Sequence, residues 1–429
     1  MRISMKNLSF AFALAAFAMS LGASAVAAQS GSGPAGIDGR WDASLSHDGT
    51  VIPFRLDIAG SGPTLKGIFY DGFRPYDETT SASFQDGKLV LTAEHYLTTI
   101  TATLSDGQLA GEVVAHSRTA VTTYGFLATR HVEAKAETAS VPQIAGSYVI
   151  PLDAPSEKSE HAFRFIVEQR GAEVAASILR VDGDTGAYSG SFRDGKWLLS
   201  HYDGSRPGVI QLSVNADGTL QIISASDKAT YTAYSEQVAQ AKGLAQPDNY
   251  QTHTTVRDPD APFTFDFPDV NGKLVSNDDP RFKGKVVLAI VTGTWCPNCH
   301  DEAKYLVQLD RKYRARGLAI VALDFEEPGQ QGTLQRQKAF VKEYGVHYTY
   351  LIAGAPDDLA QKIPQAENLN TWPATFFIGR DGRVKGVHAG FSSPATGEFN
   401  KQLQAEFTAK IERLLAERPS AASAAGSGR

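Results

Sequence analysis

The fold is decided by the stretch Val286-Val287-Leu288-Ala289-Ile290-Val291, which leads shortly afterwards into Trp295-Cys296-Pro297-Asn298-Cys299. An unbroken apolar run of this length predicts a strand buried on both faces of a sheet. Pro297 is typical of the first turn of a helix, where its missing N–H costs nothing. Cys296 and Cys299 are the 2 cysteines of the 429-residue chain. Their spacing at a strand-to-helix junction favours exchange between a dithiol and a disulfide.

The predicted helix start gives the two thiols different roles. A thiolate is the nucleophile in disulfide exchange. Free N–H groups and the dipole at a helix start favour an anion, by about 0.3–1 kcal/mol for the dipole. We therefore assign Cys296 as the attacking thiol and Cys299 as the resolving thiol. Glu302 lies on the same helical face as Cys299, so its carboxylate either relays protons for that thiol or is an ordinary solvated side chain.

The N-terminal residues predict export. Arg2 and Lys6 precede an apolar segment over 8–21 and small residues over 23–28, an order typical of a cleaved secretory signal at 1–28. We expect an exported protein, periplasmic and soluble after cleavage. The formal charge of -6, spread over both signs, argues against nucleic acid as a partner. Without a second cysteine pair, we also expect no metal site.

Residues 37–238 predict an all-β region with short alternating runs and Asp-Gly turns. Gly39-Arg40-Trp41 has a counterpart in Gly146-Ser147-Tyr148, and similar pairs of motifs recur roughly 110 residues apart. We therefore predict two duplicated repeats, 37–132 and 144–238, joined by a linker at 133–143. Each repeat is expected to form a small antiparallel barrel or curled sheet of about eight strands. Trp41 and Tyr148 are the expected buried plugs.

A linker over 245–261 precedes a region, 262–417, in which strands alternate with helices, so we predict an α/β fold with a sheet covered on both faces. The tail over 419–429 is small and polar and is expected to be disordered. The expected strands are 263–267, 285–292, 318–324, 349–353, 374–379 and 383–389, and the expected helices are 297–315, 333–344, 357–362 and 398–416.

The C-terminal motifs resemble the TlpA/ResA-type thiol–disulfide oxidoreductases. The resemblance rests on 263–273, 282–288, Trp295-Cys-Pro-Asn-Cys299 with Glu302, and Trp372-Pro-Ala-Thr-Phe-Phe-Ile-Gly-Arg-Asp-Gly382, and covers about 255–417. It implies a thioredoxin-like fold and a redox-active disulfide between Cys296 and Cys299, with no other cofactor.

The resemblance also implies roles for further residues and partners. Glu302 falls on the family's acidic position, and Pro373 on the cis-proline that helps present a client. Trp295, which precedes Cys296, and Trp372, which precedes Pro373, are with Pro373 the expected docking residues. Protein disulfides are the implied clients, reduced with electrons from a membrane-bound thiol donor.

Four alternatives stay open. Cys296-Pro297-Asn298-Cys299-His300 also fits the attachment motif of c-type haem, although the 3 methionines all lie in the predicted signal and cannot supply the second ligand. In the favoured interpretation His300 is an exposed helix residue. A zinc site lacks ligands at matched spacing. A peroxiredoxin-like antioxidant function is a weaker alternative from the same superfamily. A non-enzymatic alternative is a β-domain binding or scaffold protein with a vestigial redox domain.

Overall fold

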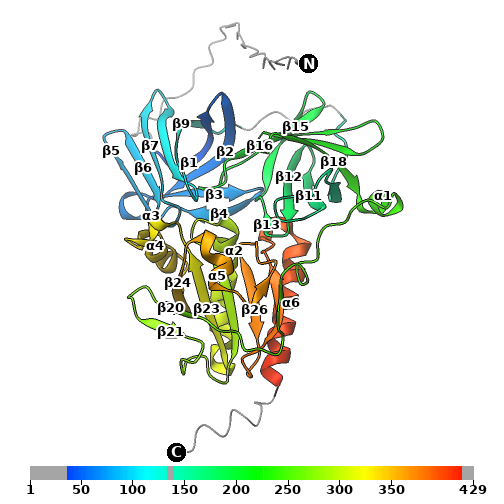
Figure 1. Cartoon of the computed structure of the whole chain (residues 1–429). Helices are drawn as coiled ribbons and strands as arrows, with labels where there is room; N and C mark the ends of the chain where they lie inside the picture. The colour runs from blue at the N-terminus through cyan, green and yellow to red at the C-terminus, as the bar shows by residue number, and fades with distance from the viewer. Residues whose placement is uncertain (1–35, 133–139, 226, 418–429) are drawn as a thin grey trace, which may run out of the picture. The chain divides into compact units, whose positions relative to one another are not determined.

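A computed structural model describes residues 36–132, 140–225 and 227–417. The predicted signal peptide, most of the linker over 133–143 and the predicted disordered tail therefore lie outside the described residues. The described chain from Ile37 onward belongs to one compact unit. Within it, residues 37–238 are called the β region and residues 262–417 the C-terminal region (Figure 1). None of the described helices combines the length and the apolar character needed to cross a bilayer.

The predicted buried strand lies in the middle of the C-terminal sheet. Every residue of β22 is buried. β22 runs parallel to β23 and antiparallel to β26, in the order β24-β23-β22-β26-β27. The strands are β22 (Val286–Thr292), β23 (Leu318–Phe325), β24 (Thr349–Gly354), β26 (Ala374–Ile378) and β27 (Val384–Ala389).

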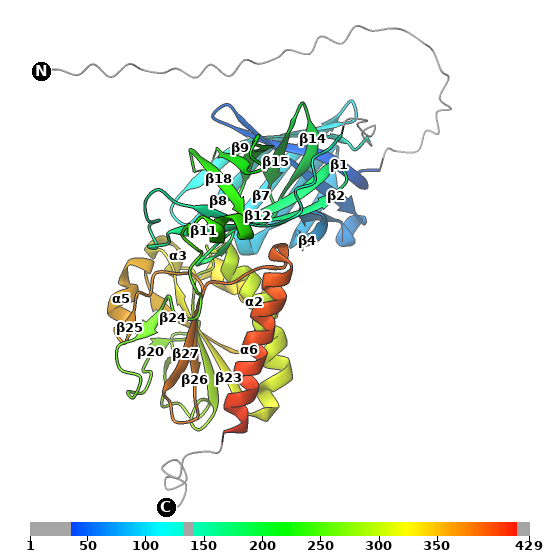
Figure 2. The same ribbon diagram turned by 90° about the vertical axis from the view of Figure 1, so that its right-hand side faces the viewer.

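Helices cover both faces of this sheet, as the alternating pattern predicts. Leu288 and Ile290 face one side and pack with apolar residues of α2 and α6, which lie next to each other in Figure 2. Val287 and Ala289 face the other side, with α5 and the phenylalanines that precede the sheet. The helices are α2 (Pro297–Tyr313), α3 (Pro328–Gln331), α4 (Gln335–Glu343), α5 (Leu359–Lys362) and α6 (Glu398–Ala416).

Some predicted element boundaries in this region are wrong. The strand expected over 263–267 is found only as β20 (Asp266–Pro268), which pairs with β21 (Leu274–Ser276). Phe263 and Phe265 are instead buried against the sheet, so their alternation reflects burial and not strand pairing. The short α3 was not predicted either. β19 (Thr255–Val256), inside the predicted linker, pairs with β25 (Ala366–Glu367).

The first sheet of the β region is open. Its antiparallel strands follow the order β4-β3-β2-β1-β9-β8-β7-β6-β5, so β4 and β5 form its two edges. The strands are β1 (Gly39–His47), β2 (Thr50–Ala59), β3 (Lys66–Asp71), β4 (Arg74–Glu78), β5 (Ser81–Gln85), β6 (Lys88–Ala93), β7 (Thr98–Ser105), β8 (Gln108–His116) and β9 (Val121–Arg130).

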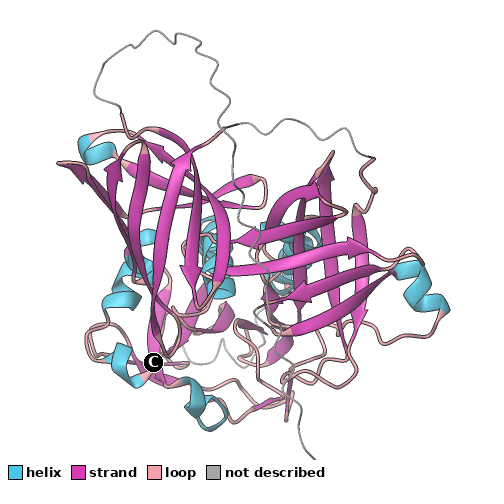
Figure 3. Ribbon diagram, turned by 90° about the horizontal axis from the view of Figure 1, so that it is seen from above, coloured by secondary structure: helices cyan, strands magenta, loops and turns pink. Residues whose placement is uncertain are grey.

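The second sheet closes into a barrel, because β11 also pairs with β12. Figure 3 shows the two groups of strands from above. The strands are β10 (Gly146–Pro151), β11 (Ala162–Arg170), β12 (Glu173–Arg180), β13 (Gly183–Asp184), β14 (Tyr188–Arg193), β15 (Lys196–His201), β16 (Gly208–Val214), β17 (Leu220–Ser224) and β18 (Ala229–Ser235), followed by α1 (Glu236–Ala241).

The two sheets share several features that the predicted duplication requires. Each has nine strands among the described residues, one more than expected, and the orders β2-β1-β9-β8-β7-β6-β5 and β11-β10-β18-β17-β16-β15-β14 correspond. The indole N–H of Trp41 donates to the carbonyl of Ile37, and the hydroxyl of Tyr148 to the carbonyl of Ile144. Trp41 is fully buried, whereas Tyr148 is only half-buried. The duplication itself stays a prediction.

Candidate active site

The two thiols lie at the start of α2, as the sequence predicts. Cys296 is the N-cap residue and Pro297 occupies the first turn. Both cysteines are free thiols, and the backbone N–H of Cys299 donates to Sγ of Cys296 over 3.3 Å. Only 4% of Cys296 and 1% of Cys299 is exposed. The N-terminal sulfur is therefore held by the helix start, and the second sulfur lies deeper.

The loop before β26 lies directly against Cys296. The peptide bond between Trp372 and Pro373 is cis, as the family resemblance implies. The thiol of Cys296 donates to the carbonyl oxygen of Trp372 over 3.4 Å. The rings of Trp295 and Trp372 are 5.5 Å apart, and the indole N–H of Trp295 donates to the carbonyl of Phe325. Trp372 therefore contacts the sulfur directly, and Trp295 and Pro373 lie next to Cys296 and Trp372 in the chain.

The environment of Cys299 favours its neutral form. Burial raises the pKa of this thiol well above its ordinary value, and the neighbouring sulfur of Cys296 raises it further. Hydrogen bonds from Thr292 and from the backbone of Gly293 oppose this rise. Cys299 therefore needs a base before it can act as a nucleophile.

Glu302 is buried, so its interpretation as a solvated side chain is wrong. None of its surface is exposed, and its Oε1 accepts a hydrogen bond of 2.5 Å from the hydroxyl of Thr375. Burial raises the pKa of Glu302 to about 8, although the Thr375 bond opposes the shift. Its Oε2 has no hydrogen-bond partner among the described residues. Such a carboxyl can hold or release a proton near neutral pH.

Tyr348 lies within electrostatic range of both Glu302 and Cys299. The pKa of Tyr348 is raised first by its shielding from water and then by the charges of Glu302, Asp310 and Cys299. Neither Tyr348 nor Thr375 was singled out from the sequence. Thr375 had a signal, because it is the polar residue in the otherwise apolar strand Ala374–Ile378. Tyr348 had none, since it lies in the loop just before β24, far from Cys299 and Glu302 in the sequence.

His300 is not the exposed helix residue that the sequence suggested. Its surface is fully buried, its ring stacks on Tyr96 of the β region at 4.3 Å, and both ring nitrogens have partners. Nε2 lies 2.7 Å from the carbonyl of Thr294, and Nδ1 lies 2.7 Å from the hydroxyl of Tyr344. Burial holds the pKa of His300 well below its ordinary value. The neutral ring then donates to Thr294 and accepts from Tyr344, which leaves no nitrogen free for an axial ligand.

A buried group of charges from the β region meets the residues around the cysteines. Arg206 donates to Oδ1 of Asn298 over 3.1 Å and to Asp203 over 3.2 Å, and lies 3.6 Å from Asp301. The hydroxyl of Tyr76 also donates to Asp301. Burial raises the pKa of Asp301 to about 7, against the opposing charge of Arg206. No sequence pattern linked Arg206 to the cysteines.

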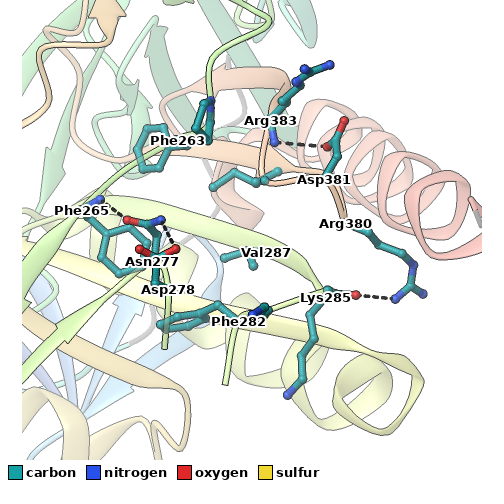
Figure 4. A pocket seen from close by; sticks show the side chains of 16 residues that line it. Phe263, Phe265, Asn277, Asp278, Phe282, Lys285, Val287, Arg380, Asp381 and Arg383 are labelled. Atoms are coloured by element: carbon teal, nitrogen blue, oxygen red, sulfur yellow. Dashed lines mark hydrogen bonds between the residues drawn. The ribbon is translucent and has the colours of Figure 1, made fainter. Parts of the chain in front are cut away.

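A well-defined pocket of the described structure lies away from the thiols. Its volume is about 570 Å³, and Phe263, Phe265 and Phe282 line it together with Arg380 (Figure 4). The guanidinium of Arg380 already donates to the carbonyl of Gly284. The pocket reaches β22 at Val287, near the start of the strand, whereas the cysteines follow its end. It is therefore not part of the candidate site.

Comparison with known proteins identifies the C-terminal region. The redoxin family matches residues 256–403. The thiol-disulfide oxidoreductase ResA of Bacillus thuringiensis (strain Al Hakam) is 35% identical over 116 residues, which are 27% of this chain and 60% of that protein. ResA of Bacillus thuringiensis subsp. konkukian is 32% identical over 143 residues, which are 33% of this chain and 72% of that protein. A solved thiol:disulfide interchange protein of Chlorobium tepidum TLS is 24% identical, covers 38% of this chain and 100% of its own, and has a TM-score of 0.30.

The redoxin match and the ResA relatives define the class of the C-terminal region as a redoxin with a thioredoxin-like fold, so the predicted fold is confirmed for this part of the chain. The chain belongs to the ResA-type thiol–disulfide oxidoreductases. It spans 60% of the length of the first of these relatives. The activity, clients and partners of this protein are therefore proposals.

Proposed function

We propose that this protein is an exported thiol–disulfide oxidoreductase that reduces disulfides of client proteins through Cys296 and Cys299. The observation that supports it most is the arrangement of the two sulfurs at the start of α2. Cys296 accepts a hydrogen bond from the helix backbone and touches the carbonyl of Trp372. Cys299 lies one turn deeper, in surroundings that keep it protonated. This difference fits an attacking and a resolving thiol.

The reaction proceeds in two exchanges. The thiolate of Cys296 attacks one sulfur of the client disulfide, the client S–S bond breaks, and the released client thiolate takes a proton from water. Cys299 then gives its proton to Glu302 and attacks Sγ of Cys296, which breaks the mixed disulfide and releases the second client thiolate. This thiolate also takes a proton from water. The client gains two electrons and two protons, and the enzyme ends with a disulfide. A dithiol donor, membrane-bound in our proposal, restores the reduced form.

Glu302 is the proposed base for the second exchange. Its pKa of about 8 makes the carboxylate available near neutral pH, and general bases with such pKa values contribute about 10²–10⁴-fold to rates. The bond from Thr375 fixes one oxygen and leaves Oε2 for the proton. Trp295, Trp372 and Pro373 are the proposed client-docking residues, because the carbonyl of Trp372 contacts Cys296 and the Trp295 ring lies 5.5 Å from the Trp372 ring.

Reduction of insulin by dithiothreitol, followed by turbidity, tests the proposal. The wild-type chain should accelerate precipitation, and Cys296→Ser should not. Cys299→Ser should accumulate a mixed disulfide with insulin chains, which non-reducing electrophoresis detects. A wild-type chain without acceleration would refute the reductase activity. A Cys299→Ser protein without adducts would refute the assigned order of attack.

A further inference from the structure

The β region contacts the residues around Cys296 from several directions. We call Trp295, Cys296, Asn298, Trp372 and the segment 391–393 the redox face. The segment from Val181 to Asp184, which consists of the turn after β12 and the two residues of β13, is called the cover segment. Both names refer to groups within the same compact unit of the chain. These contacts bring the cover segment against residues beside Cys296, a residue that is only 4% exposed.

The cover segment pairs with the redox face through its backbone. Gly183 forms an isolated parallel bridge with Phe391, and the side-chain amide of Asn298 donates to the carbonyl of Asp182 over 3.0 Å. Gly183 has a φ of +126, and a Cβ there would lie 2.6 Å from both Asn298 Nδ2 and Phe391 O. Only glycine fits this contact, since real Cβ atoms do not approach other atoms so closely.

Charged and polar side chains hold the cover segment in place. The carboxylate of Asp184 accepts hydrogen bonds from the backbone N–H of Ser393 over 2.7 Å and from its hydroxyl over 3.0 Å. Arg206 donates to the carbonyl of Asp184 and to the side chain of Asn298. The amide of Asn298 therefore donates to Asp182 through its nitrogen and accepts from Arg206 through its oxygen.

Two further side chains of the β region lie over the tryptophans. The guanidinium of Arg118, between β8 and β9, lies 5.3 Å from the centre of a Trp295 ring and pairs with Glu327. The ammonium of Lys158, between β10 and β11, donates to the carbonyl of Asn370 over 2.6 Å and lies 5.9 Å from the Trp372 ring. Both sheets of the β region therefore reach the redox face.

We propose that the cover segment is an intramolecular stand-in for a client, so that a client protein must displace it before its disulfide can reach Cys296. The partner that fits this surface is a protein with an extended segment beside its disulfide, which pairs with Phe391 in place of Gly183. This inference rests on the proposed function, because it assumes that Cys296 attacks a protein disulfide. The contacts to be broken are mainly hydrogen bonds and ion pairs, which water can replace on both surfaces.

The rate at which a bulky maleimide–polyethylene glycol labels Cys296 tests the cover. All proteins carry Cys299→Ser, so Cys296 is the one remaining thiol. Gly183→Ala should raise the labelling rate about tenfold, because its methyl group cannot fit against Asn298 and Phe391. Gly171→Ala is the control: its φ of +62 is also positive, but a Cβ there has no neighbour within 4 Å. It should label at the rate of the parent.

Asp184→Asn is the second variant, in case Gly183→Ala does not fold. It weakens the two bonds to Ser393 without adding volume and should also accelerate labelling, by about threefold for a loss of roughly 0.6 kcal/mol. Parent-like labelling in both folded variants would overturn the cover. Insulin reduction is then measured with the wild type and with the same two substitutions in a chain that has Cys299. This measurement separates a failure of the cover from a failure of the proposed function. If the wild type reduces insulin but the two variants are not labelled faster, the cover is overturned. If the variants are labelled faster but the wild type does not reduce insulin, the proposed function is overturned.

Discussion

The β region and the C-terminal region divide reaction and access between them. The C-terminal region holds the thiol pair, the buried carboxyl of Glu302 and the cis-proline loop before β26. The β region has no cysteine, yet Gly183 and Arg206 reach the residues beside the thiols. In our proposal the C-terminal region therefore carries out the reaction, and the β region is placed to control which molecules reach the sulfur. The predictions below test this division, starting with the reaction itself.

Loss of the attacking sulfur should have the largest effect. Cys296→Ser replaces the nucleophile by a hydroxyl that stays protonated at neutral pH, so insulin reduction should fall by at least about a thousandfold. Steady-state turbidity assays with dithiothreitol measure this. The matched control is Ser105→Ala, which removes an exposed hydroxyl at the end of β7 but no sulfur, and it should retain activity. Activity within tenfold of wild type in Cys296→Ser would place the reaction elsewhere.

Glu302→Gln should slow the second exchange by about a hundredfold, because the base for Cys299 is lost. In the wild type the rate of resolution should rise with pH through about 8, where Glu302 ionises, and the variant should lack this inflection. Stopped-flow resolution of a preformed mixed disulfide gives both profiles. Glu398→Gln on the surface of α6 is the control, and its carboxylate is 81% exposed. Superimposable profiles for Glu302→Gln and wild type would remove Glu302 from the mechanism.

The buried carboxyl should also make stability depend on pH. In the unfolded chain Glu302 ionises near its ordinary pKa, whereas in the folded protein it keeps its proton up to about pH 8. Between these values the folded state binds more protons, so the contribution of Glu302 to stability is fully present at low pH and is lost as pH rises. The slope is up to about 1.4 kcal/mol per pH unit.

Urea unfolding at pH 5 and pH 8 measures this dependence. The difference in unfolding free energy between the two pH values should be smaller in Glu302→Gln than in the wild type. An equal pH dependence in both proteins would show that the folded protein does not retain the proton on Glu302.

The smallest predicted effects compare the two sheets within the β region. Trp41→Phe and Tyr148→Phe each remove a hydrogen bond to the carbonyl four residues earlier, which is worth about 1 kcal/mol. Trp41 is fully buried and also loses volume, so its substitution should cost roughly 1–2 kcal/mol more than that of half-buried Tyr148. Thermal or urea unfolding checks the order. A larger loss from Tyr148→Phe would argue against equivalent roles in the two sheets.

Prediction from the sequence succeeded where the relevant residues are neighbours in the chain. The strand and helix around Cys296 follow from an apolar run and from Pro297, which act locally. The boundaries failed at Phe263 and Phe265, because packing against the sheet produces the same alternation as strand pairing. The exposure of His300 was also misjudged, because Tyr96, which covers it, comes from a distant segment of the chain.

The sequence by itself determined the pair of cysteines at a helix start, the all-β character of 37–238 and the α/β character of 262–417, because periodicity and turn residues act over a few residues. Only the tertiary structure decided that Glu302 is buried on Thr375 and that the redox face is covered. Asn298 is separated from Arg206 by 92 residues and from Asp182 by 116. Contacts over such separations depend on how the sheets close and pack, and local sequence patterns carry no record of them.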